Sequence, residues 1–180
     1  MLDDFEEIDS QYSIKVIDEN TILGKYSTDF SKRDHVSKNW LLRASLINLD
    51  ILDENFIMLD DDNRPIKKID IEHFINDGKY NAYYFYDLLS WSNFQTDYDF
   101  GQHNMKNVLD GHGLELLSYS SHKPQIINKE IFKEVIDKYF EIGLEKPIDE
   151  WSVYFNYANS KYPFLFNKVK YDTLNWPGLS

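Results

Sequence analysis

Two histidines have the residue type and the glycine-rich setting that an acid–base pair could use. His103 follows Gly-Gln, and His112 is flanked by glycines on both sides. Two histidines can cleave RNA when one is neutral and the other is protonated near neutral pH. Such a site also needs cations for the phosphate, and only Lys106 and Lys123 lie nearby, among many carboxylates. The sequence therefore favours histidines in turns, and a small enzyme using His103 and His112 stays an alternative.

Three consecutive carboxylates, Asp60, Asp61 and Asp62, suggest a calcium loop at first sight. In that loop the sixth residue is glycine and the twelfth is a bidentate glutamate. Here these positions hold Pro65 and Ile71, so the register fails. The triplet predicts a solvated turn and, as a second interpretation, an acidic tip that faces a partner.

No other catalytic, metal or cofactor motif is present in the sequence. With no cysteine, a thiolate nucleophile, a disulfide and a cysteine zinc site are all excluded. His103 and His112 lack the spacing that fixes two zinc ligands on one helix face. The serine-hydrolase elbow and the glycine-rich nucleotide loops have no candidate. We expect no catalytic residue, no metal and no cofactor.

Carboxylates alternate with aromatic residues in one segment of the chain, residues 93–100. Asp97, Tyr98, Asp99 and Phe100 follow the two-residue period of a strand. This pattern predicts a half-buried strand with its acids outward, and it equally suits a protein interface, whose centres are rich in aromatic residues. We take these four residues, together with Asp60, Asp61 and Asp62, as candidates for partner binding.

The elements that position these residues are predicted from hydrophobic period and turn chemistry. In the first half we expect a hairpin over 12–16 and 22–26, a helix capped by Ser37, strands over 56–59 and 66–69, and a short helix over 71–77 that Gly78 ends. In the second half we expect a short helix within 101–113, paired strands over 114–119 and 125–127, a helix capped by Asn128 and ended by Gly143, and a helix from Asp149 followed by an extended tail.

Helices and strands are thus intermixed, which predicts an α+β fold with a mostly antiparallel sheet and several packed helices. We expect residues 1–10 to form an acidic, frayed N-terminus and residues 11–180 to form a single domain.

The charge of the chain limits its partners. It has 31 acidic and 19 basic residues, a formal charge of −12, which repels nucleic acid and anionic membranes. No stretch approaches the roughly 18 apolar residues of a membrane span, and the first residues are acidic where a secretory signal would be basic. We therefore expect a cytoplasmic protein that binds neither nucleic acid nor membranes directly.

In type, this small, acidic, cysteine-free and aromatic-rich chain resembles the immunity proteins of bacterial polymorphic-toxin and contact-dependent growth inhibition systems. The acidic segments at 60–62 and 97–99 are the plausible contacts. The resemblance implies a non-catalytic inhibitor that occludes the active site of a cognate basic toxin, commonly a nuclease. Besides the histidine enzyme, the alternatives are an acidic mimic of nucleic acid that blocks a DNA-binding enzyme, and a structural or adaptor subunit.

Overall fold

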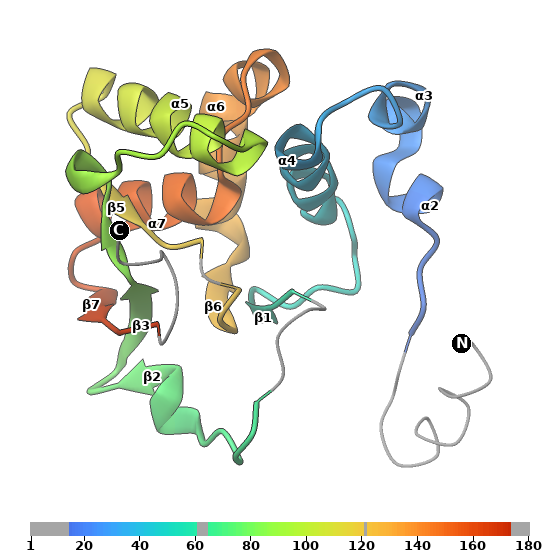
Figure 1. The fold of residues 1–180 in the computed structure, drawn as a ribbon. Helices are drawn as coiled ribbons and strands as arrows, with labels where there is room; N and C mark the ends of the chain where they lie inside the picture. The colour runs from blue at the N-terminus through green and yellow to red at the C-terminus, as the bar shows by residue number, and fades with distance from the viewer. Residues whose placement is uncertain (1–14, 61–64, 121, 174–180) are drawn as a thin grey trace.

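The computed structural model describes residues 15–60, 65–120 and 122–173, and it has the expected α+β class (Figure 1). The helices are α2 (Glu19–Leu23), α3 (Ser27–Phe30), α4 (His35–Leu46), α5 (Asp97–Gly111), α6 (Lys129–Glu145) and α7 (Glu150–Lys161). The strands are β1 (Asn55–Met58), β2 (Ile75–Asn76), β3 (Lys79–Tyr84), β4 (Tyr86–Asp87), β5 (Leu117–Ser118), β6 (Gln125–Asn128) and β7 (Phe166–Lys170). In the described residues, no helix is both long enough and apolar enough to cross a membrane.

The strands form three small sheets, in the orders β1-β6, β2-β3-β7 and β4-β5. All pairs are antiparallel except β3 and β7, which run parallel. The predicted pairing of 114–119 with 125–127 is wrong, because β5 pairs with β4 and β6 pairs with β1. All four residues of β6 are buried, a position that a surface hairpin does not provide.

Two further strand and helix predictions around the acidic turn are wrong. Residues 66–69 form no strand, and the Ile66 side chain is 95% exposed. Residues 71–77 hold one short 3₁₀ turn and then β2. Asp77 and Gly78 both have positive φ, 51° and 74°, so this pair forms the tight two-residue turn that joins β2 to β3. Gly78 therefore turns a hairpin and does not end a helix.

The predicted N-terminal hairpin is also wrong for the residues that the structure describes. Asp18 caps α2 by accepting a hydrogen bond from the backbone N–H of Asn20 at 2.9 Å. This cap satisfies a free backbone N–H group at the start of the helix. Leu23 is the residue of α2 that is buried. Residues 12–14, and the predicted frayed N-terminus 1–10, lie outside the described residues.

The three long helices that follow a polar cap are confirmed. Asn128 and Asp149 cap α6 and α7 as predicted. In α4 the cap is Asp34 rather than Ser37, because Asp34 accepts from both the backbone N–H of Ser37, at 3.0 Å, and its hydroxyl, at 2.6 Å. The predicted helix within 101–113 is the second part of the longer α5.

A close approach between α4 and α6 lies at the centre of the core. The Trp40 ring is fully buried against Gly143, and α6 continues past this glycine to Glu145. A Cβ atom at residue 143 would lie 2.1 Å from two atoms of the indole. Gly143 therefore makes room for Trp40 and does not end the helix. The other large buried side chains include Tyr119, Phe132, Tyr139, Tyr154 and Phe155.

Replacing Gly143 by alanine tests this packing. We expect G143A to lower the free energy of unfolding by about 2–3 kcal/mol, because the added methyl group displaces the Trp40 indole. Urea denaturation monitored by tryptophan fluorescence measures the change. The control is G111A in α5, where no atom lies within 4 Å of the added Cβ and stability should be unchanged or slightly higher. Equal effects of the two substitutions would contradict the assigned role of Gly143.

Candidate functional site

The predicted binding segment 93–100 is the start of a helix, and the expected strand is wrong. Thr96 and Asp99 form a reciprocal capping box: the Thr96 hydroxyl accepts from the Asp99 N–H, and the Asp99 carboxylate accepts from the Thr96 N–H at 2.9 Å. Trp91 Nε1 also donates to this carboxylate, at 3.1 Å. These bonds satisfy the free N–H groups of the first turn, which a strand in the same place would leave unpaired.

The helical period sorts the four predicted residues onto two sides of α5. Asp99 is buried in the cap, and the Tyr98 hydroxyl points inward and donates to the Ser120 carbonyl at 3.1 Å. Asp97 is exposed, and Phe100 is 48% exposed. A partner could therefore reach Asp97 and Phe100, while Asp99 and the hydroxyl of Tyr98 have structural roles.

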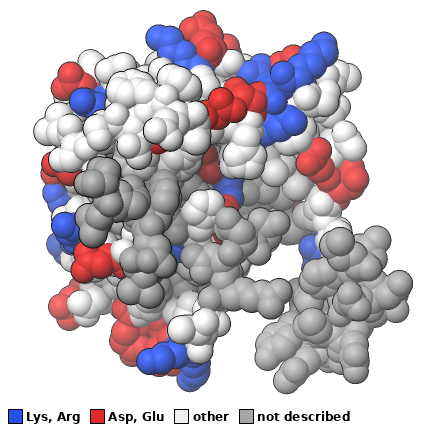
Figure 2. All heavy atoms as spheres, in the orientation of Figure 1, with Lys and Arg blue, Asp and Glu red and all other residues white. Residues whose placement is uncertain are grey.

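An exposed aromatic cluster covers the outer side of this first turn. Phe94 is 60% exposed, and its ring centroid lies 6.4 Å from that of Phe100. His103 stacks on Phe94 at 3.6 Å, and because its Nε2 lies 2.8 Å from the carbonyl of Asn93, this nitrogen must donate. We call Phe94, Phe100, His103 and the adjacent Asp97 the aromatic face. Figure 2 shows a largely uncharged area over α5, with charged side chains interspersed around it.

His103 and His112 do not form a pair. His112 is the C-terminal cap of α5, with its ring edge-on to Tyr139 at 5.1 Å. Nine residues of helix separate the two histidines, which is roughly 13 Å along the axis. A general base and a general acid must each lie within hydrogen-bond distance of the reacting atoms, directly or through one water. This spacing places the two histidines too far apart to act on the same bond.

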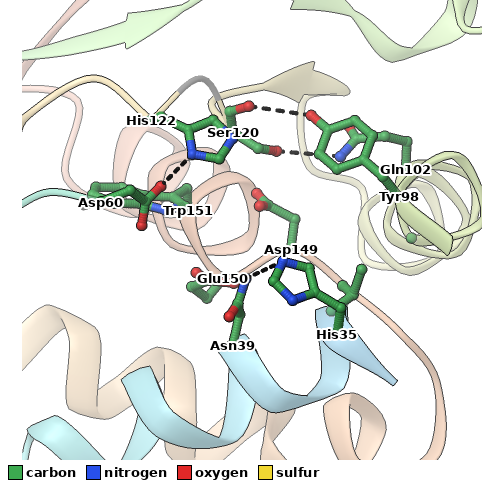
Figure 3. A pocket seen from close by; sticks show the side chains of 12 residues that line it. His35, Asn39, Asp60, Tyr98, Gln102, Ser120, His122, Asp149, Glu150 and Trp151 are labelled. Atoms are coloured by element: carbon green, nitrogen blue, oxygen red, sulfur yellow. Dashed lines mark hydrogen bonds and ion pairs between the residues drawn. The ribbon is translucent and has the colours of Figure 1, made fainter. Parts of the chain in front are cut away.

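Asp60 and Tyr98, from the two predicted acidic segments, line one small pocket between α4, α5 and the start of α7 (Figure 3). It encloses about 60 Å³ that water-sized molecules can reach, enough for a few waters. Asp149 lies between Tyr98 and His35 in this view. Asp61 and Asp62 lie outside the described residues.

A network of charged side chains lies beside this pocket: Asp60, His122 and Glu150 line it, and Arg43 joins them from behind. The Arg43 guanidinium pairs with the carboxylates of Asp60 and Glu150, the latter at 3.2 Å from Nε to Oε1. His122 Nδ1 lies 2.9 Å from Asp60 Oδ2. The guanidinium also packs over the Trp151 ring, 5.1 Å from its centroid. Sequence reasoning missed Arg43, Glu150 and His122, because four separate segments supply this network and no local spacing indicates it.

Burial controls the protonation of the two acids at the start of α7. It raises the pKa of Asp149, although hydrogen bonds from Ser152 oppose the shift. Burial, with the neighbouring Asp149 charge, raises the pKa of Glu150 to about 7, against the opposing attraction of Arg43. Each of these carboxylates has a partner inside the protein, so the network acts as a structural link. Within the described part of the chain, no three His, Asp or Glu side chains are grouped to hold a metal ion.

Comparisons of the chain with protein-family models, with curated proteins and with solved structures find no significant match.

The capping role of Asp99 gives a stability prediction. Burial alone would raise the pKa of this carboxyl, but the hydrogen bonds from Thr96, Gln95 and Trp91 outweigh it and lower the pKa. We expect D99A to cost about 2 kcal/mol of unfolding free energy in urea denaturation at pH 7, because it removes an N-terminal cap and a buried acceptor. D97A, its exposed neighbour, should cost less than about 1 kcal/mol. The reverse order would contradict the capping box.

The pKa of Glu150 predicts a pH dependence of stability. The folded protein holds this proton up to about pH 7, whereas the unfolded chain releases it near pH 4.5, so ionisation between these values destabilises the fold. We therefore expect wild type to lose stability relative to E150Q as pH rises from 5 to 7.5, in urea denaturation at a series of pH values. A relative gain over that range would show that the Arg43 pair outweighs burial.

Proposed function

We propose that this protein is a non-catalytic immunity-type inhibitor that binds a basic toxin of the nuclease class and occludes its active site in the cytoplasm. The observation that carries the proposal is the aromatic face. One exposed phenylalanine ring, Phe100, stands on the first turn of α5, and a second, Phe94, lies just before this helix and is stacked on a histidine whose own hydrogen bond fixes it.

Exposed rings held in place suit the centre of a protein interface. Aromatic residues are enriched at interface centres, and rings that are already ordered lose little conformational entropy on binding. The carboxylate of Asp97 lies next to them on the same turn. A basic groove that normally binds nucleic acid offers both an apolar floor and cationic rims to such a face.

The charge of the chain specifies the partner. At −12 the protein repels nucleic acid and further acidic chains, itself included, and it attracts a cationic protein over several ångströms. Attraction of this kind speeds association more than it raises affinity. The proposal therefore includes fast, salt-sensitive association and no turnover.

Co-expression tests the function itself. The C-terminal region of the protein encoded immediately upstream of this gene is expressed alone and together with this protein, and bacterial growth is measured. We expect toxicity that co-expression relieves, with a stable 1:1 complex of the purified pair. Toxicity without rescue, or rescue without a complex, would overturn the immunity proposal for that neighbour and favour the nucleic-acid mimic.

Substitutions on the aromatic face test where the toxin binds. We expect the double variant F94A/F100A to weaken binding about 30-fold by calorimetry, because central aromatic residues dominate interface energies. D97K should mainly slow association, and the more so at low salt. The controls are F164A, which removes a ring 65% exposed elsewhere, and D137K on the exposed side of α6. Equal losses in variants and controls would place the interface elsewhere.

A further inference from the structure

Lys123, which pairs with no carboxylate among the described residues, lies against two tyrosine rings beside the parallel strands β3 and β7. The Lys123 ammonium is 3.7 Å from the centroid of Tyr83 and 4.7 Å from that of Tyr171. Tyr83 belongs to β3, and the backbone N–H of Tyr171 donates to Tyr84 at 3.1 Å, which holds that residue beside the same strand. Strand β3 therefore fixes the two tyrosine rings that contact the Lys123 ammonium.

Near this lysine, two buried polar atoms have no hydrogen-bond partner within residues 15–60, 65–120 and 122–173. They are Nε2 of His73 and the hydroxyl of Tyr171. The His73 ring stacks on Tyr83 at 4.8 Å. Burial, and then the nearby charge of Lys123, lowers the pKa of His73, so the imidazole is neutral and one of its nitrogens can donate. A buried polar atom without a hydrogen-bond partner costs free energy, and here two such atoms lie near one cation.

The surface next to this group is positively charged, unlike the chain as a whole. His73 and Lys123 line an open pocket of about 460 Å³ together with Lys67, Lys68 and Asp70. The one carboxylate among the lining residues, Asp70, pairs with Lys68 at 3.0 Å. In the part of the chain that the structure describes, no carboxylate offsets the charge of Lys123, and burial lowers its pKa.

We propose that this pocket binds a small oxyanion, a phosphate or carboxylate group, with Lys123 as its charged contact and His73 as a donor that lines it. Tyr171 does not line the pocket, and its hydroxyl is the second donor from behind Lys123, whose ammonium lies 4.7 Å from the Tyr171 ring. An oxyanion has several acceptor oxygens and supplies what these three groups lack, while charge-assisted hydrogen bonds are roughly twice as strong as neutral ones. The rings of Tyr83 and Tyr171 hold the ammonium in place before binding. This inference is independent of the proposed toxin-binding function.

Titration with inorganic phosphate tests the site on the full chain. The His73 ring signals are followed by ¹H–¹³C NMR at constant ionic strength, first at one pH as phosphate is added and then over a series of pH values with and without phosphate. We expect a saturable shift of these signals and a higher His73 pKa with phosphate bound, because the anion offsets the charge of Lys123. K123M should weaken binding about tenfold or more, and K133M, a lysine on the exposed side of α6, should leave it unchanged.

Each outcome of this titration decides one point. A parallel titration with acetate distinguishes a phosphate site from a carboxylate site, because the anion that binds more tightly identifies the preferred group. Shifts that do not saturate, or that persist fully in K123M, would overturn the proposal. Because K123M could also disturb the tyrosines, Y171F provides a second variant: it keeps the ring under the ammonium, removes the donor, and should weaken phosphate binding on its own.

Discussion

The half-buried guanidinium of Arg43 is the group on which the arrangement of the elements depends. Glu150 lies in the first turn of α7, where the helix dipole favours an acid, but burial disfavours its charge and raises its pKa to about 7 even with a cation beside it. Arg43 supplies that cation from α4 and also pairs with Asp60 beyond β1. Asp60 in turn contacts His122 in the loop before β6. Two helices and two loops are therefore positioned by one side chain, and removing it would leave two carboxylates without their cation.

A second constraint, the capping box at Thr96 and Asp99, determines what the surface can present. The alternation of acids and aromatics satisfies the period of a strand, but the cap starts a helix of 15 residues, in which neighbours point about 100° apart. Asp99 and the Tyr98 hydroxyl turn inward, while Asp97 and Phe100 turn outward. The same turn that anchors α5 on Ser120 therefore also displays the aromatic face.

Local signals explain what could be predicted, and distant contacts explain what could not. The caps Asn128 and Asp149 act within four residues, so α6 and α7 follow from sequence. Strand pairing is decided by the core: β6 lies against β1, more than 60 residues earlier in the chain. The Asp-Gly pair at 77–78 is compatible with a helix end or a hairpin, and only the partner strand decides between them. For the site, exposed Asp97 and Phe100 were predictable, whereas the Arg43 network and the cluster around Lys123 depend on the folded chain.

The distribution of charge separates the two proposed surfaces. A net charge of −12 acts at long range and is screened beyond about 8–10 Å at physiological salt, so it guides a basic protein toward the molecule. The positive group at Lys123 acts at contact distance, where unpaired donors and partial burial outweigh the distant acids. A small anion that comes within contact distance of Lys123 can therefore still be bound, although the molecule as a whole repels polyanions at longer range. The same chain thus suits a cationic protein on its aromatic face and a single oxyanion in the pocket lined by His73 and Lys123, because the two interactions depend on different ranges of the electrostatic field.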